Sequence, residues 1–265
     1  MSIEKKPLVN DLYTADPSAH VFNGKIYIYP SHDEDIDVEN NDNGDQYDMK
    51  DYHVYEMPDT ETYPRDCGCV LKLEDIPWAS KQLWAPDCVE KDGKYYFVYP
   101  ARDKEGFFRI GIAIGDKPEG PFKPEPNYIP GSYSIDPCMF PDTDGKYYLT
   151  FGGIWGGQLD QYRNNKWSAD NKEPQGDEEA CTAKIALMKD NLLEMAEEPK
   201  DIMILDENGK PLTGGDEARR YFEDPWLFKK GDTYYFTYST GTTHLLCYAT
   251  SKNVYGPYTY GGVIL

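Results

Sequence analysis

The sequence lacks any apolar run that approaches the roughly 18 residues of a membrane-spanning helix. Its first six residues also lack the apolar core of a secretory signal peptide. We therefore expect a cytoplasmic protein with no membrane partner. An engineered removal of a leader would leave the same N-terminus.

Basic residues are scarce relative to acidic ones. The chain has 27 Lys and Arg against 47 Asp and Glu, which gives a formal net charge of −20. A surface of this sign repels the phosphates of nucleic acids and anionic membranes, so we expect neither as a partner. A neutral ligand such as a sugar is compatible with the charge, and most of these charges are expected simply to keep the surface solvated.

Metal-binding and redox motifs are missing. The six cysteines include no Cys-x-x-Cys pair, and the four histidines show neither His-x-His nor His-x-x-x-His spacing, so no metal ligand is predicted. We expect reduced thiols, mostly buried in strands. Cys67 and Cys69, which flank a single glycine, are interpreted as two strand or loop thiols rather than as a metal or redox pair.

Aromatic residues, by contrast, are abundant: they make up 14% of the chain and include 23 Tyr, a composition that favours strands over helices. One sequence pattern occurs four times. It consists of an acid beside a proline, a short apolar run, a turn that contains glycine, and an aromatic strand. The copies occupy residues 16–29, 85–99, 136–150 and 221–239.

The turns inside these four sequence patterns predict β-hairpins. Units of about four strands, repeated every 40–50 residues or so and lengthened by loops, are typical of a β-propeller. We expect one all-β domain over residues 1–265 with blades at about 16–75, 85–130, 135–205 and 222–262. A short turn near residues 189–197 is the only helix expected, and the loop at residues 31–51 is expected at the rim of the functional face.

Asp16 and the motifs Trp84-Ala-Pro-Asp87, Ser134-Ile-Asp-Pro137 and Phe222-Glu-Asp-Pro225 each precede such a hairpin. Four motifs in this order resemble glycoside hydrolase family 43, and most of all its β-xylosidase and α-L-arabinofuranosidase branch. The resemblance covers nearly the whole chain. It implies a five-bladed β-propeller, of which this sequence lacks most of the fifth blade: either it is a piece of a longer enzyme, or the ring closes in an unusual way.

The resemblance assigns roles to three acids. Asp16 matches the general base, Glu223 the general acid, and Asp136 the carboxylate that orients the acid and raises its pKa. Hydrolysis with inversion needs a base and an acid roughly 6.5–9.5 Å apart, with room for water between them. A further negative charge keeps the acid protonated near neutral pH.

Two neighbouring acids are expected to be structural. Side chains alternate along a strand, so only one of Glu223 and Asp224 should face the cavity, and the family pattern favours Glu223. Asp87 lies one residue out of register with the other acids, and we expect it to make structural hydrogen bonds.

Four further residues are candidates for binding the substrate. Trp84 resembles the aromatic wall of the family's sugar pocket, and a tryptophan packed between blades is the alternative. Trp155 lies on a glycine-flanked loop, and Asp33 and Arg220 complete the set.

No cofactor is expected for the chemistry. The resemblance implies a structural calcium ion in the central channel, with ligands that the sequence does not identify. His244, in the fourth unit, does not match the histidine that the family places near this ion.

These features predict an inverting exo-glycosidase that releases xylose or arabinofuranose from plant hemicellulose oligosaccharides. A non-catalytic carbohydrate-binding propeller is the alternative, and a scaffold for protein partners is a more remote one. Neither sugar is preferred over the other. An open ring would favour association into oligomers.

Overall fold

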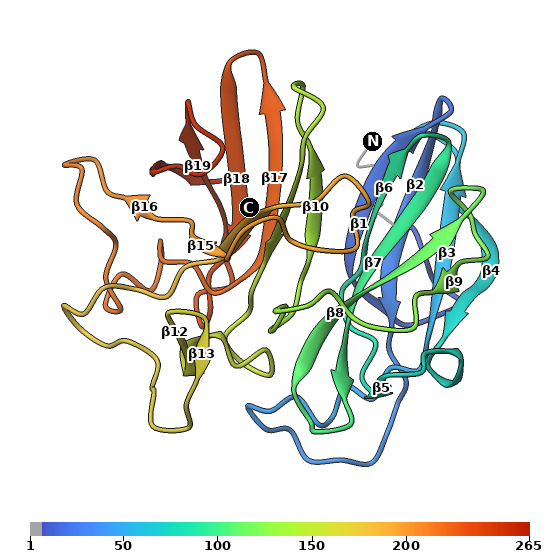
Figure 1. Cartoon of the computed structure of the whole chain (residues 1–265), viewed down its shortest axis with the longest axis horizontal. Helices are drawn as coiled ribbons and strands as arrows, with labels where there is room; N and C mark the ends of the chain where they lie inside the picture. The colour runs from blue at the N-terminus through green and yellow to red at the C-terminus, as the bar shows by residue number, and fades with distance from the viewer. Residues whose placement is uncertain (1–6) are drawn as a thin grey trace, which may run out of the picture.

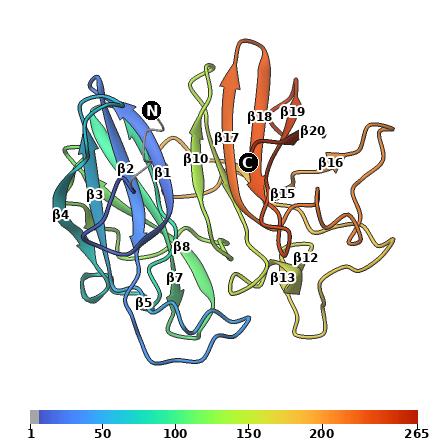
Figure 2. The same ribbon diagram turned by 180° about the vertical axis from the view of Figure 1, so that it is seen from behind.

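Four β-sheets follow one another along the chain in the computed structural model, which describes residues 7–265 (Figure 1). Residues 1–6, on which the signal-peptide expectation rests, lie outside the described part. The innermost strands β1, β6, β10 and β17 contact one another in sequence and lie together near the middle of the molecule, as both views show (Figures 1 and 2). Each sheet is therefore one blade of a propeller.

The blades take up most of the regular structure. Blade 1 contains β1 (Thr14–Phe22), β2 (Lys25–His32), β3 (Asp51–Met57) and β4 (Arg65–Lys72). Blade 2 contains β5 (Ala79–Lys81), β6 (Asp87–Lys91), β7 (Lys94–Asp103), β8 (Phe108–Gly115) and β9 (Lys123–Pro124). Blade 3 contains β10 (Cys138–Pro141), β11 (Tyr147–Phe151), β14 (Lys184–Leu187) and β15 (Lys200–Asp201). Blade 4 contains β17 (Glu223–Lys230), β18 (Thr233–Ser239), β19 (Leu246–Ser251) and β20 (Tyr258–Val263).

A few short elements lie outside this scheme. Strand β16 (Ile204–Leu205) pairs in parallel with β20, and β12 (Tyr162–Arg163) pairs with β13 (Lys166–Trp167). Two single-turn 3-10 helices are present, η1 (Leu73–Asp75) and η2 (Leu159–Gln161). The prediction of a helical turn near residues 189–197 is wrong. Met188 and Met195 instead form an antiparallel bridge, which closes that segment into a small hairpin.

Tight turns join the first two strands of each blade where glycine predicted them. Asn23 and Gly24 have φ of 53° and 78°, and Asp92 and Gly93 have φ of 53° and 73°. Two successive positive φ angles are the requirement of a type I′ turn, whose twist matches that of the flanking strands. These turns fix the register of β1 with β2 and of β6 with β7.

Aromatic side chains pack the blades against each other. Phe97 of blade 2 meets Tyr29 and Tyr52 of blade 1, with ring centroids 5.9 and 5.0 Å apart. Phe140 of blade 3 meets Tyr234 of blade 4 at 6.2 Å. In each of the adjacent tyrosine pairs 95–96, 147–148 and 234–235, one ring is buried and the other is partly buried.

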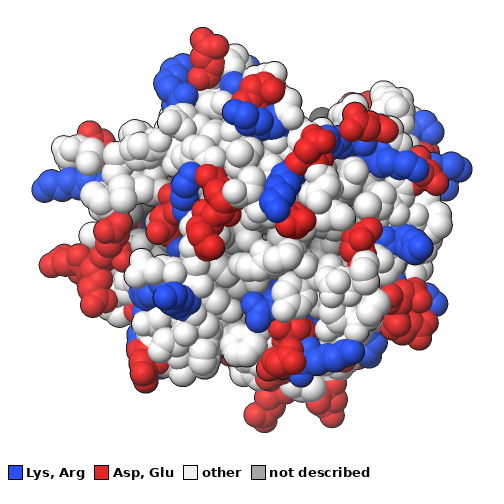
Figure 3. Space-filling model, viewed as in Figure 1, with Lys and Arg blue, Asp and Glu red and all other residues white. Residues whose placement is uncertain are grey.

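The predicted all-β propeller is confirmed, with four blades and no fifth blade among residues 7–265. In that part of the chain no helix is long and apolar enough to cross a membrane. On the face shown in Figure 3, acidic and basic side chains are interspersed, and the basic ones do not merge into one patch.

Candidate active site

The four innermost strands begin with equivalent residues at the same place in each blade. A proline stands near the start of each strand or directly before it, and the two residues before that proline line one common cavity of about 790 Å³. Directly before the prolines stand Asp16, Ala85, Asp136 and Asp224, and one position earlier stand Ala15, Trp84, Ile135 and Glu223. The propeller thus brings four sequence-distant segments to one centre.

An unusual backbone conformation aims the acids at this centre. Asp16, Asp136 and Asp224 have φ of 45°, 55° and 56°, in the left-handed region that aspartate tolerates better than most residues. The following proline also disfavours a helical conformation. The pairing of β1 is interrupted between Ala15 and Ser18, as is that of β17 between Glu223 and Trp226. Strain of this kind is concentrated at functional sites.

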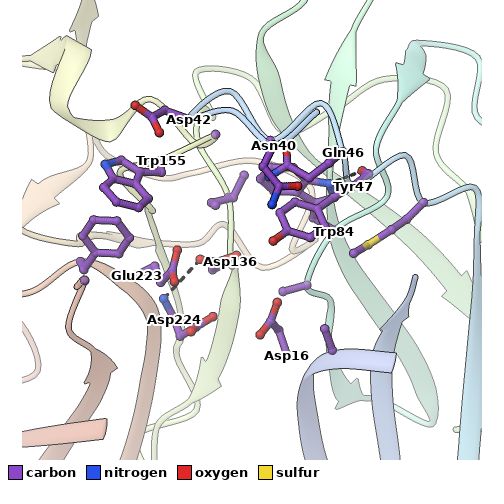
Figure 4. Close-up of a pocket in the computed structure, with 18 of the residues that line it drawn as sticks. Asp16, Asn40, Asp42, Gln46, Tyr47, Trp84, Asp136, Trp155, Glu223 and Asp224 are labelled. Atoms are coloured by element: carbon purple, nitrogen blue, oxygen red, sulfur yellow. Dashed lines mark hydrogen bonds between the residues drawn. The ribbon is translucent and has the colours of Figure 1, made fainter. Parts of the chain in front are cut away.

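The three acids predicted to catalyse lie together in the cavity. Asp16 faces Glu223 and Asp224 across it, and Asp136 lies between the two sides (Figure 4). Asp136 is buried, whereas Asp16 is open to the solvent of the cavity. This arrangement offers two carboxyl groups on opposite sides of a bound molecule.

Glu223 has the electrostatics of a proton donor. Burial, followed by the charges of Asp224 and Asp16, raises its pKa to about 8. A carboxyl group with such a pKa is protonated at neutral pH and can give its proton to a leaving oxygen. The sequence suggested Asp136 as the source of the charge that raises this pKa, whereas the structure gives burial, Asp224 and Asp16 as the causes.

Asp136 is placed to position the acid. Its Oδ2 accepts a hydrogen bond of 3.2 Å from the backbone N–H of Asp224, the residue that follows Glu223. Burial raises the pKa of Asp136 well above its usual range, and the charges of Asp224, Glu223 and Asp16 raise it further. Asp136 therefore interacts with Glu223 electrostatically and also holds the adjoining backbone.

The expectation that Asp224 points away from the cavity is wrong. Asp224 lines the cavity beside Glu223, because the left-handed conformation in β17 breaks the alternation of side chains. Its carboxylate accepts a hydrogen bond of 3.0 Å from Ser239 Oγ. Burial, together with the charge of Asp16, raises its pKa to about 7.

Asp16 has a different environment from Glu223. Burial raises its pKa, Asp33 raises it further, and its own backbone N–H lowers it. Asp33 lines the same cavity, so this candidate from the sequence is at the site. A carboxyl group that is open to the cavity can accept a proton from water.

Asp87 lies outside the cavity lining and fits the structural role expected for it. It is fully buried, and its carboxylate accepts a hydrogen bond of 2.6 Å from His20 and one of 2.7 Å from the backbone N–H of Met139. These bonds join the innermost strands of blades 1, 2 and 3.

The two buried aspartates give opposite expectations for stability. Because the pKa of Asp136 is higher in the folded chain than in the unfolded one, its ionisation costs folding free energy above the unfolded pKa. We expect Asp136→Asn to raise Tm at pH 7 by a few degrees, at about 2–4 °C per kcal/mol. Asp87→Asn should lower Tm, since it weakens buried hydrogen bonds worth about 1–3 kcal/mol. Calorimetry at pH 4 and pH 7 checks this, and a gain for Asp136→Asn that is equal at both pH values would contradict it.

Aromatic side chains form two walls of the cavity. Trp84 is largely buried but presents part of its ring, and its Nε1 donates to the Tyr47 carbonyl at 2.8 Å. Trp155 is 47% exposed and stands edge-on to Phe222 at 5.1 Å. Figure 4 shows the two indoles on opposite sides of the opening. Such walls suit the apolar faces of sugar rings.

Two loops form the rim of the cavity. The segment 33–50, between β2 and β3, contributes Asp33 and residues around Tyr47 to the lining. It meets the loop after β11, where the backbone N–H of Gly156 donates to the Asp42 carbonyl at 2.6 Å. The rim is therefore closed by a direct bond between blades 1 and 3.

Arg102, which no sequence motif singled out, holds both rim loops. Its Nη2 donates to the carbonyls of Asn43 at 2.8 Å and of Gly156 at 3.2 Å, and its Nη1 to that of Gly106 at 2.7 Å. The guanidinium is buried over the ring of Phe108, 4.4 Å from the centroid. No local motif marks this arginine, because its partners come from three separate segments.

Arg220, by contrast, does not line the cavity. Its side chain is buried, and Nη2 donates to Glu173 at 2.5 Å in the insertion of blade 3. The neighbouring Tyr221 is anchored through its hydroxyl to the Gly152 carbonyl. The sequence placed Arg220 near the acid only by its position in the chain.

The acids also border a second cavity of about 270 Å³ along the channel between the blades. This space shares Asp16, Asp136 and Asp224 with the first cavity, and it reaches Ser18. The hydroxyl of Ser18 is buried and has no hydrogen-bond partner in the described part of the chain. Carboxylate and hydroxyl oxygens are the ligands of a hard cation such as Ca²⁺, so these residues fit one.

Comparison with known proteins gives one family. The profile of glycosyl hydrolases family 43 matches residues 5–261. A protein of Bacteroides ovatus named xylosidase/arabinosidase is 56% identical over 266 residues, which span 100% of this chain and 82% of that protein.

Solved structures agree with this match. The structure described as RS223-Beta-xylosidase has a TM-score of 0.95 at 56% identity, over 98% of this chain and 80% of that chain. A β-xylosidase/α-arabinofuranosidase from a compost microbial metagenome, in complex with xylotriose and in a calcium-free form, has a TM-score of 0.95 at 55% identity, with the same coverage. This protein therefore belongs to glycoside hydrolase family 43, a family of inverting glycoside hydrolases that act on hemicellulose.

Proposed function

We propose that this chain is an exo-acting glycosidase that removes terminal xylose and arabinofuranose units from hemicellulose oligosaccharides. The observation that carries the proposal is the placement of Asp16 opposite Glu223 in a cavity whose rim is closed between Asp42 and Gly156. A closed rim admits the end of a chain rather than its middle. A non-catalytic carbohydrate-binding propeller is not favoured, because binding alone requires no acid with a pKa near 8.

The roles of the acids follow from their surroundings. Asp16, ionised, takes a proton from the water that attacks the anomeric carbon. Glu223, protonated, gives its proton to the glycosidic oxygen on the opposite face of the sugar. Asp136 positions the acid through the backbone N–H of Asp224.

The choice of sugar follows from the relatives. The compost enzyme is described as both a β-xylosidase and an α-arabinofuranosidase, and the Bacteroides ovatus protein as a xylosidase/arabinosidase. Trp84 and Trp155 would pack on the apolar faces of either sugar. We therefore propose activity on both.

We also propose that Asp16, Asp136, Asp224 and Ser18 border a calcium site in the channel, consistent with a related structure that is described as a calcium-free form. A bound cation would favour the ionised forms of these carboxyl groups. The carboxylate of Asp16 would then stay ionised, and able to act as a base, down to a lower pH.

The test is turnover by the whole chain. Aryl β-xyloside and aryl α-arabinofuranoside should both be hydrolysed, xylotriose should be shortened one unit at a time, and polymeric xylan should release only xylose at first. Glu223→Ala is the control, and it should lose most of its activity on xylotriose and xylan, whose leaving groups need a proton. Early release of xylobiose or longer products would contradict exo action, and no turnover of either aryl glycoside by the folded chain would contradict the proposed function.

The pH profile supplies a separate prediction. We expect kcat/KM to fall at high pH as Glu223 loses its proton, at about pH 8, and at low pH as Asp16 gains one, at a pH above the usual range of aspartate. Asp224→Asn removes a negative charge beside Glu223, so the alkaline limb should move to lower pH. Rates measured from pH 4 to pH 10 check this, and an alkaline limb that stays in place or moves upward would count against Glu223 as the acid.

A further inference from the structure

Two histidines and an aspartate gather in blade 1, outside the lining of the active-site cavity. One ligand atom from each of His32, Asp51 and His53 lies within 4.8 Å of those of the other two. The three side chains are 18%, 25% and 16% exposed, so they are largely enclosed but remain open to ions from solvent.

Both imidazole rings pair with a carboxylate, one inside the cluster and one behind it. A ring nitrogen of each, Nδ1, pairs with a carboxylate: His32 with Asp51 at 2.6 Å, and His53 with Asp66 at 2.9 Å. For His53, the carboxylate of Asp66 on Nδ1 fixes the tautomer and leaves a lone pair on Nε2, as in carboxylate–histidine–metal triads. For His32, whose Nδ1 partner Asp51 belongs to the cluster itself, an ion would take the place of the proton between Nδ1 and the carboxylate. Among the hydrogen bonds of residues 7–265, none involves Nε2 of either ring. The two rings meet edge to face, 5.4 Å apart.

We infer that His32, Asp51 and His53 form a binding site for a divalent transition-metal ion, with zinc the best match. Imidazole and carboxylate ligands suit Zn²⁺, whereas Ca²⁺ takes six to eight oxygens. Tetrahedral zinc at about 2.0–2.2 Å from its ligands places them roughly 3.3 Å apart, so the three groups close in slightly and water fills the fourth position. Asp66 remains the carboxylate behind His53.

The site lies where a bound metal ion would connect two strands of blade 1. His32 is the last residue of β2 and Asp51 the first of β3, so they mark the two ends of the rim segment 33–50. Pairing of β2 with β3 runs only as far as Ile28 with Tyr55, and the strands are not paired at His32 and Asp51. A metal ion there joins the base of the rim segment where the sheet leaves it open. The inference rests on blade 1 alone and does not depend on the proposed function.

The test is zinc binding by the whole chain after treatment with a chelator. Calorimetric titration with ZnCl₂, in a buffer that contains Ca²⁺ to fill the channel, should show one zinc per chain. Tm should rise by about 5–10 °C at zinc concentrations near 100 times Kd. His32→Gln and His53→Gln should each weaken binding by about 100-fold or more, whereas the matched variant of an exposed histidine, His244→Gln, should bind as the wild type does.

Spectroscopy of the wild-type chain shows directly which histidines bind the zinc ion. Imidazole ¹H–¹⁵N correlation spectra should show zinc-induced shifts of a ring nitrogen in two of the four histidines, and these should be the two signals that the variants remove. The inference is overturned by the absence of zinc binding in the wild type, by binding that survives in both Gln variants, or by shifts in His20 and His244 instead.

Discussion

Glu223→Gln is expected to lower kcat/KM for xylobiose by about 10³–10⁴-fold, the upper part of the range that a general acid contributes. The loss should be far smaller for an aryl xyloside with a good leaving group such as dinitrophenolate, because this leaving group departs without a proton. The amide of Gln keeps the size of Glu223 in its buried place but cannot supply a proton. Steady-state kinetics on a series of leaving groups measures the difference.

A matched substitution separates this effect from a general loss of structure. Glu56→Gln changes an equivalent side chain in β3, where it pairs with Lys25 at 3.1 Å and lies outside the cavity lining. We expect its kinetics to equal those of the wild type. A loss in Glu223→Gln that is the same for xylobiose and for the dinitrophenyl glycoside would assign Glu223 a different role.

Asp16→Asn is expected to lower kcat by about 10²–10⁴-fold for every substrate. The attack of water is part of each reaction, so the loss should not depend on the leaving group. This independence distinguishes a base from an acid. The acidic limb of the pH profile should also disappear from the residual activity, because the residue that titrates there has been removed.

The turn variant Asp144→Asn is a suitable control, since Asp144 is exposed at the hairpin of blade 3, where it caps its own turn and pairs with Lys146. Its kcat should be unchanged. If Asp16→Asn loses little activity, or if its loss grows as the leaving group becomes poorer, then Asp16 is not the base.

The sequence was most informative where a repeat linked residue type to backbone geometry. Each hairpin depends on residues such as Asn23 and Gly24 that adopt positive φ, so the turns could be located from sequence. Asp16 and Asp136 stand 8 and 9 positions before the glycines of these turns, Gly24 and Gly145. Once the turns were located, the starts of the innermost strands and their acids followed.

The prediction that Asp224 faces away from the cavity was wrong because β17 is not a regular strand at this point. The interruption in β17 places Glu223 and Asp224 on the same side, and only the backbone conformation reveals it. Asp224 is the charge that acts most on Glu223, so the omission concerned the electrostatics of the acid itself.

Sequence patterns could not predict contacts between segments that are far apart in the chain. Arg102 binds carbonyls of the two rim loops, and neither loop carries a signal for an arginine. His32 and His53 are 21 positions apart and fit no metal motif, yet the ends of β2 and β3 bring them together. Arg220 shows the converse, since it is close to Glu223 in sequence but turns toward Glu173.

The most direct test of the account is the configuration of the sugar that the enzyme releases first. ¹H NMR of xylobiose hydrolysis, recorded before mutarotation, should show α-xylose from the β-linked substrate. This result is required if Asp16 directs water from the face opposite Glu223. If β-xylose appears first, water does not enter between these two carboxyl groups, and the assignment of Asp16 as the base and Glu223 as the acid is contradicted.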